Sequence, residues 1–176
     1  MSKKRLATVW LDGCSGCHMS FLDIDLRLIA LAELADLVYS PLVDAKVFPE
    51  NVDITLVEGA VSSDEDLHKI QMVRARTTTL VSLGDCAVTA NVPGMRNPFG
   101  TKAVYERAYK ENVTLDPGIP DEVPHLLPYA RPIHEVVEVD VFVPGCPPHA
   151  DVIFFAVTEL LNGRKPDLSV MTRFGA

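Results

Sequence analysis

Hydrophobic and polar positions along the chain follow two periods. Apolar, partly β-branched runs indicate buried strands at 6–11, 36–43, 52–61, 77–84 and 136–143. Apolar residues at helical spacing indicate helices at 17–34, 64–76, 100–111 and 147–163, with a short helix at 85–90. Because strands and helices alternate and the strands are apolar throughout, the pattern predicts an α/β protein with a doubly wound parallel sheet. Five strands suit the flavodoxin-like order 2-1-3-4-5.

The length of 176 residues suggests a single domain, 1–176, with a substantial core. Segment 91–136 interrupts the pattern between the fourth and fifth strands, and it holds seven of the thirteen prolines. We therefore expect a proline-rich insertion there, which is either functional or poorly ordered.

Charge and apolar run lengths limit the classes of function. A net charge of −8 argues against nucleic acid as the main partner. The basic N-terminus is followed by an apolar run too short for a signal peptide, and charges interrupt every longer apolar stretch. We expect a cytoplasmic protein without a membrane segment. Structural disulfides are rare in that compartment, so its cysteines are expected to bind metal or to act in redox chemistry.

Each of the four cysteines follows a predicted strand. Cys14 and Cys17 follow the first strand, Cys86 the fourth and Cys146 the fifth. The carboxyl ends of parallel strands share one edge of a sheet, where open α/β folds bind their ligands. The sequence therefore predicts that four thiols, spread over 133 positions, meet at that edge.

The spacing C-x2-C-x68-C-x59-C favours one kind of site over several others. A zinc ribbon normally uses two close pairs, and a redox dithiol would use only Cys14 and Cys17. Four convergent thiolates suit a [4Fe–4S] cluster, which needs one ligand for each iron. Four buried structural cysteines are the alternative without chemistry. The fold also permits an FMN-binding carrier, although cysteines make "DGCSGCHMS" a poor phosphate cradle, and no G-x-G-x-x-G follows the first strand.

Residues beside the cysteines fit a cluster site. Three of the cysteines stand at or before a predicted helix start, which favours negative charge. Pro147 and Pro148 fix the backbone beyond Cys146 and donate no competing hydrogen bonds. Four glycines would let backbone amides approach the sulfurs: Gly13, Gly16, Gly84 and Gly145.

Two other side chains are candidates for a functional role. Glu58 ends the third strand, so we expect it at the same edge as the cysteines. It could hydrogen-bond near the cluster, relay protons or meet a partner; the alternatives are a solvated acid or a helix cap. His18 could donate to a cluster sulfur, or it could be a surface or hydrogen-bonded histidine without that role.

Four further residues near the motifs have structural interpretations. Asp12 and Asp85 flank cysteines and are expected to cap turns. His149 is expected to belong to the start of the last helix. Trp10 fits the core better than a role in electron tunnelling.

Four motifs carry a family resemblance. "WLDGCSGCHMSFLD", "VEGAV", "SLGDCA" and "VPGCPP", in that order, resemble the small subunits of [NiFe] hydrogenases. The proximal-cluster subunit of respiratory NADH dehydrogenase shares the later motifs, but it has adjacent cysteines at the first site. The likeness runs from residue 6 to about residue 162 and is weakest in the proline-rich segment. Four cysteines, the chain length and the lack of a twin-arginine leader resemble the soluble, bidirectional, NAD-reducing branch.

This resemblance implies a role in electron transfer. It implies that one proximal [4Fe–4S] cluster is bound by Cys14, Cys17, Cys86 and Cys146. The nickel–iron centre would lie in a large subunit, and FMN, further iron–sulfur clusters and NAD in diaphorase subunits. No catalytic residue is expected in this chain. Segment 91–136 would be a docking surface for the large subunit or a decorated loop.

Two other functions remain open at this stage. The first is the proximal-cluster subunit of an NADH:quinone oxidoreductase-like complex, which would share the fold. The second is a zinc-stabilised interaction module without enzymatic function.

Overall fold

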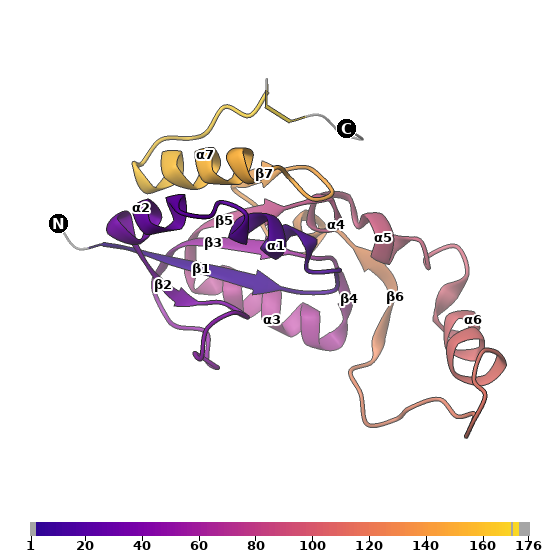
Figure 1. Ribbon diagram of the computed structural model, residues 1–176. Helices are drawn as coiled ribbons and strands as arrows, with labels where there is room; N and C mark the ends of the chain where they lie inside the picture. The colour runs from indigo at the N-terminus through magenta and orange to yellow at the C-terminus, as the bar shows by residue number, and fades with distance from the viewer. Residues whose placement is uncertain (1–2, 170, 173–176) are drawn as a thin grey trace.

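A computed structural model describes residues 3–169 and 171–172 of the chain (Figure 1). Its main sheet contains five parallel strands in the order β2-β1-β3-β5-β7. These strands are β1 (Lys4–Trp10), β2 (Ala35–Tyr39), β3 (Val52–Glu58), β5 (Thr77–Leu83) and β7 (Val141–Val143). When only these five strands are numbered along the chain, their order in the sheet is 2-1-3-4-5. This confirms the predicted α/β fold and strand order.

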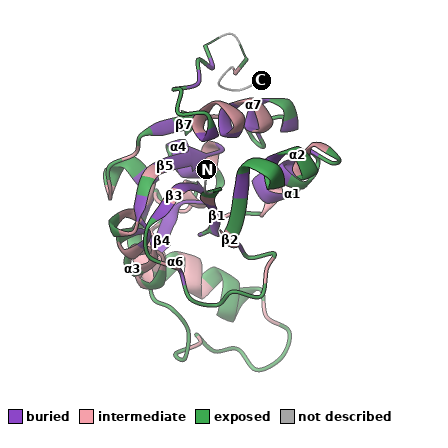
Figure 2. Ribbon diagram, turned by 90° about the vertical axis from the view of Figure 1, so that its left-hand side faces the viewer, coloured by how far each residue is buried: buried purple, intermediate pink, exposed green. Residues whose placement is uncertain are grey.

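Helices cover both faces of the sheet. On one face lie α1 (Gly16–Leu22), α2 (Arg27–Leu34) and α7 (Ala150–Leu161), which bury Phe21, Leu31 and Ile153 in one core cluster. On the other face lies α3 (Asp64–Ala75), which buries Ile70 and Val73 in a second cluster. The burial colouring shows the central strands as the most enclosed part of the molecule (Figure 2). No helix in the described part of the chain is long and apolar enough to span a bilayer.

The chain between β5 and β7 packs against the sheet at its two ends and forms a lobe in between. It contains α4 (Asp85–Thr89), α5 (Asn91–Gly94), α6 (Gly100–Glu106), a π-helical turn η1 (Arg107–Glu111), β6 (Leu126–Arg131) and a 3₁₀ turn η2 (Ile133–Glu135). In Figure 1, α6 projects away from the sheet. Strand β6 pairs antiparallel with β4 (Val61–Ser63), a second small sheet that the hydrophobic pattern did not predict.

Two side chains, Arg96 and Asn97, connect the lobe to the backbones of β4 and β6. The Arg96 guanidinium donates to the carbonyls of Ser62, at 3.1 Å, and Leu127, at 2.9 Å. Asn97 both accepts from the Ala130 N–H, at 2.8 Å, and donates to the Ala130 carbonyl, at 2.9 Å. The base of the lobe is therefore held by side-chain hydrogen bonds to strand backbones.

The predicted helix 17–34 is two helices in the structure. Helix α1 ends at Leu22, and α2 begins at Arg27. Asp25 between them has φ +59°, a left-handed conformation that interrupts a helix. Apolar periodicity continues across the break because Ile24 is buried in the turn, so the pattern alone does not reveal it.

Three predicted strands are also shorter than expected, and the one predicted at 36–43 ends at Tyr39. The strand at 136–143 is limited to β7, because the Asp140 carboxylate accepts the Leu80 N–H at 2.7 Å in place of a strand carbonyl. The strand at 52–61 ends at Glu58, where Gly59 adopts φ +93°. A Cβ on Gly59 would lie 2.7 Å from the Leu11 carbonyl carbon, so only glycine fits this bend.

Candidate metal centre

Cys14 and Cys17 lie in the turn between β1 and α1. Ser15 adopts φ +67° there, and Cys17 is the second residue of α1. The Gly16 N–H donates to the Cys14 sulfur over 3.4 Å. Cys17 is buried against the core, whereas Cys14 is exposed. The turn therefore presents one sulfur toward the protein interior and one toward the surface.

Cys86 lies in α4, directly after β5. Gly84 precedes it with φ +90°, and a Cβ on Gly84 would lie 2.3 Å from the Cys17 sulfur. That separation is far below van der Waals contact, so this glycine lets the first and second cysteine loops approach. The backbone N–H of Val92 donates to Cys86, which is half-buried.

Cys146 lies in the loop between β7 and α7 and is exposed. Gly145 before it has φ +141°, and a Cβ there would meet the Pro148 backbone at 2.6 Å. The Asn91 side-chain amide donates to the Cys146 sulfur over 3.5 Å. All four cysteines are free thiols.

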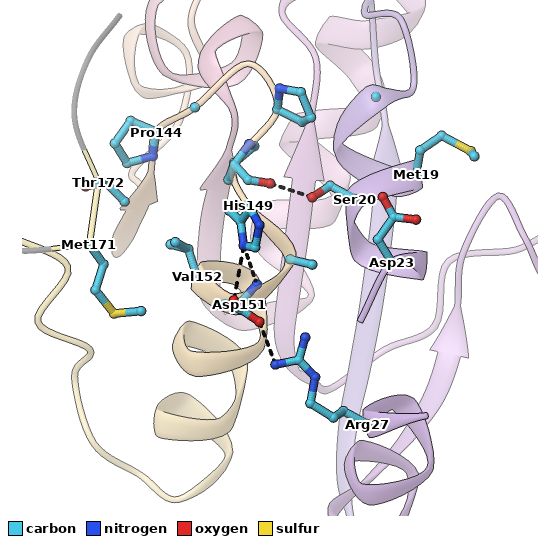
Figure 3. Close-up of a pocket in the computed structure, with 15 residues that line it drawn as sticks. Met19, Ser20, Asp23, Arg27, Pro144, His149, Asp151, Val152, Met171 and Thr172 are labelled. Carbon is cyan, nitrogen blue, oxygen red and sulfur yellow. Dashed lines mark hydrogen bonds and ion pairs between the residues drawn. The ribbon is translucent and has the colours of Figure 1, made fainter. Parts of the chain in front are cut away.

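Hydrogen bonds join the three cysteine-bearing loops to one another. Asp85 accepts the Gly145 N–H at 2.7 Å, and its own N–H donates to the Gly145 carbonyl at 3.1 Å. The Ser20 hydroxyl in α1 donates to the Pro148 carbonyl at 2.5 Å, a bond drawn in Figure 3. The loops are therefore held in register by the protein itself.

Two of the four thiols, those of Cys17 and Cys86, have raised pKa values. Burial raises the pKa of Cys17 far above its ordinary value, and the negative charges of Glu58, Cys86, Cys14 and Cys146 add to the rise. Burial also raises the pKa of Cys86, while the Val92 N–H lowers it and Cys146, Cys14 and Glu58 raise it. Such thiols keep their protons unless a cation compensates the thiolate charge.

Within residues 3–169 and 171–172, no group of three or more His, Cys, Asp or Glu side chains could hold a single metal ion. This finding concerns one ion. A cubane places an iron behind each ligand sulfur, so its four ligands stand further apart than those of one ion.

Glu58 lies at the same edge and is buried, with 2% of its surface exposed. Its Oε2 accepts the backbone N–H of His18 at 2.8 Å and lies 2.5 Å from the ring Nδ1 of the same residue. The His18 Nε2 lies 3.0 Å from the Thr8 hydroxyl, which donates to Ser40 at 2.8 Å. Glu58 is thus neither a solvated acid nor a helix cap. His18 uses both ring nitrogens on Glu58 and Thr8, so it is a hydrogen-bonded buried histidine.

Three other predicted residues have structural partners. Asp85 fixes the Cys146 loop through Gly145, and Asp12 accepts from the Ser62 hydroxyl. His149 caps α7 by accepting the Asp151 N–H at 3.2 Å, as the sequence suggested. The core assignment of Trp10 is wrong, because its side chain is 43% exposed and its indole N–H donates to the Gly13 carbonyl.

A cavity of about 760 Å³ lies beside the cysteine loops, between α1 and α7 (Figure 3). Arg27 and Asp151 form an ion pair of 2.7 Å across it.

The sequence did not indicate two residues of the candidate metal centre, Ser20 and Asn91, which bond to the Cys146 loop. Neither has a motif of its own, since each role depends on a residue more than 50 positions away.

The sequence matches a known protein family. Residues 14–160 match the family described as NADH ubiquinone oxidoreductase, 20 Kd subunit. The match covers most of the chain, and the protein belongs to this family.

Individual relatives are hydrogenase subunits. The chain is 43% identical over 172 residues to the NAD-reducing hydrogenase HoxS subunit delta of Cupriavidus necator, covering 94% of this chain and 82% of the relative. It is 40% identical over 173 residues to a subunit of the F420-non-reducing hydrogenase of Methanothermobacter thermautotrophicus, covering 94% of this chain but only 56% of that relative.

Solved structures agree with these relatives. A chain in the crystal structure of NAD+-reducing [NiFe]-hydrogenase in the H2-reduced state superposes with a TM-score of 0.93 at 42% identity, covering 98% of this chain and 99% of that one. A [NiFeSe]-hydrogenase chain from Dm. baculatum superposes with a TM-score of 0.63 at 17% identity, covering 95% of this chain and 67% of that one, and shows the shared fold alone. The predicted resemblance to small subunits of NAD-reducing [NiFe] hydrogenases is confirmed.

Proposed function

We propose that this chain is the electron-transfer small subunit of a cytoplasmic NAD-reducing [NiFe] hydrogenase, and that Cys14, Cys17, Cys86 and Cys146 bind one [4Fe–4S] cluster. The observation that carries the proposal is that four free cysteines lie on three loops after β1, β5 and β7, and that hydrogen bonds join these loops at the carboxyl end of the parallel sheet. We treat residues 1–176 as one iron–sulfur domain, with 91–136 as its proline-rich insertion.

The donor set and its surroundings fit such a cluster. Four thiols supply one ligand for each iron. Gly84 leaves space at the Cys17 sulfur that any side chain would fill. Donors from Gly16, Val92 and Asn91 reach three of the sulfurs, and such bonds stabilise thiolates. When bound, the cluster would supply one-electron transfer.

The chain's own residues would position that transfer. Cys17 lies against the apolar core, which excludes water from one side of the site. Cys14 and Cys146 are exposed, so the opposite side can face a partner. We assign Glu58 as a neighbour of the cluster, because it is buried and its charge acts on both Cys17 and Cys86. A proton-relay role for Glu58 stays a prediction.

The proposal includes partners, because one cluster needs both a donor and an acceptor of electrons. A large subunit would carry the nickel–iron centre, and diaphorase subunits would carry flavin, further iron–sulfur clusters and the NAD site. The projecting lobe suits the large subunit as its docking surface, since it begins at the cysteine loops and exposes large apolar side chains. These include Val92 at 57%, Met95 at 65%, Phe99 at 72% and Tyr129 at 61% exposure.

Anaerobic purification of the native complex, with metal analysis and partner identification, tests this function. We expect about four iron atoms for each copy of this chain and a nickel-bearing partner. Cys86→Ser and Cys146→Ser are expected to lose iron and electron transfer. Thr89→Ser is the control, because Thr89 is exposed in the same helix as Cys86. Iron content and activity unchanged in both cysteine variants would refute the ligand assignment.

The same preparation separates the alternatives. Zinc without iron would select the interaction module. Membrane co-fractionation without nickel would select the quinone-reductase subunit.

A further inference from the structure

Three hydrogen-bond donors reach cysteine sulfurs in the described part of the chain. Two are backbone groups: the Gly16 N–H on Cys14 and the Val92 N–H on Cys86. The third is the side-chain amide of Asn91, whose Nδ2 lies 3.5 Å from the Cys146 sulfur. Sulfur acceptors form longer hydrogen bonds than oxygen acceptors, so this contact is within range. Asn91 therefore differs from the other donors in being open to substitution without a change of backbone.

The backbone holds Asn91 in place between two cysteine loops. Ala90 before it adopts φ +62°, which ends α4 and turns the chain into α5. The Ala90 N–H donates to the Cys86 carbonyl at 3.0 Å, and the Gly94 N–H donates to the Ala90 carbonyl at 2.8 Å. The Asn91 backbone is thus anchored beside Cys86, while its side chain crosses to Cys146, 55 positions further along the chain.

We propose that Asn91 is a positioning residue that raises the reduction potential of the cluster by donating its side-chain amide to the Cys146 sulfur. This inference rests on the proposed function, because it requires a cluster on these cysteines. A donor that points at a ligand sulfur stabilises negative charge there. Reduction adds an electron to the cluster, so the donor stabilises the reduced form more than the oxidised form.

Asn91 donates its amide to an exposed sulfur at the base of the lobe. Cys146 is exposed, and the Asn91 amide is the side-chain donor that the structure places at its sulfur. Asn91 is also the first residue of α5, at the base of the lobe proposed to meet the large subunit. An uncharged amide does not titrate, so its effect on the potential should not change with pH, unlike that of a histidine or a carboxylate.

A potentiometric titration of the intact complex tests the inference, with the reduced cluster followed by electron paramagnetic resonance. Asn91→Ala is expected to shift the midpoint potential to more negative values. Asn91→Asp is expected to shift it further in the same direction, since it replaces a donor with a negative charge. Asn91→Gln keeps the amide and should return the midpoint toward that of the unmodified protein.

Asn162→Ala is the matched control. Asn162 also donates its side-chain amide, to the Thr158 carbonyl at 2.8 Å, but at the far end of α7. Its midpoint should equal that of the unmodified protein. Equal midpoints for Asn91→Ala, Asn91→Asp and the unmodified protein would overturn the inference.

Iron content measured on the same samples separates this inference from the proposed function. Loss of iron in Asn91→Ala would show that Asn91 is needed to bind the cluster, and this too would overturn a tuning role. If the unmodified complex shows neither iron on this chain nor a reduced-cluster signal, the proposed function fails first. A normal cluster with an unmoved midpoint refutes the role of Asn91 alone.

Discussion

Replacing Gly84 with alanine would put a methyl group against the sulfur of Cys17. The new Cβ would lie 2.3 Å from that sulfur and 3.3 Å from the Gly145 carbonyl oxygen. The backbone at Gly84, with φ +90° and ψ 174°, is also one that only glycine adopts readily. Backbone strain of about 2 kcal/mol and an overlap of about 2 kcal/mol together give a destabilisation of about 4 kcal/mol.

Thermal unfolding and iron content of the purified protein measure this effect. In a chain of this size, about 4 kcal/mol corresponds to a fall in Tm of roughly 8 to 16 °C. We also expect Gly84→Ala to lose iron, because the methyl group separates the loops that carry Cys17 and Cys86.

Gly163→Ala is the control for Gly84→Ala. Gly163 also has a positive φ, +74°, but a Cβ there would meet nothing within 4 Å. It should lower Tm by only roughly 2 to 4 °C, from backbone strain of about 1 kcal/mol, and leave iron content unchanged. If the two variants unfold alike and keep the same iron, the close approach at Gly84 does not shape the site.

Other parts of the structure support three further predictions. Glu58→Ala should lower the free energy of unfolding by about 3 kcal/mol, since it leaves two buried His18 nitrogens without their acceptor. Glu58→Gln keeps an acceptor and should lose much less, so equal urea midpoints for the two variants would contradict this reasoning. Burial and neighbouring negative charges raise the pKa of the Cys17 thiol above its ordinary 9.0, and that of Cys86 moves in the same direction. The unfolded chain therefore releases these protons first, so the free energy of unfolding of the metal-free protein should be intact below about pH 9 and fall above it. Denaturation at about pH 8 and about pH 10 checks this, with a smaller fall expected for Cys17→Ser; a flat profile would rule it out. Phe99→Asp should weaken association with the large subunit about tenfold, or about 1.4 kcal/mol, as measured by co-purification or binding. Leu26→Asp, at a site that is 75% exposed and directly precedes α2, should not weaken association; the reverse result would place the interface on the α2 side.

The order of the sheet could be predicted because it depends on local pattern. Apolar runs of strand length alternate with amphipathic helices, and chain connectivity then restricts the strand order. The break at Asp25 could not be predicted, since buried Ile24 continues the apolar period through a turn. The β4–β6 pair was missed because its partners, Val61 and Arg131, are 70 positions apart.

Some features of the candidate site could be predicted from the sequence and others could not. The three cysteine loops could be placed at one edge of the sheet from the sequence, because each follows a strand of one parallel sheet. The burial of Glu58 could not, since it depends on His18 from a different element covering the end of β3. Trp10 was assigned to the core on its apolar character, but it ends β1 at the edge of the sheet, where its indole N–H reaches a loop carbonyl.

The bonds from Asp85 to Gly145 and from Ser20 to Pro148 have a consequence for cofactor delivery. Because these bonds involve no sulfur, they hold the cysteine loops together without a metal. An incoming cluster would meet thiols already arranged, with Cys14 and Cys146 accessible at the entrance and Cys17 at the back. On the proposed function, cluster binding would then require little rearrangement of this chain.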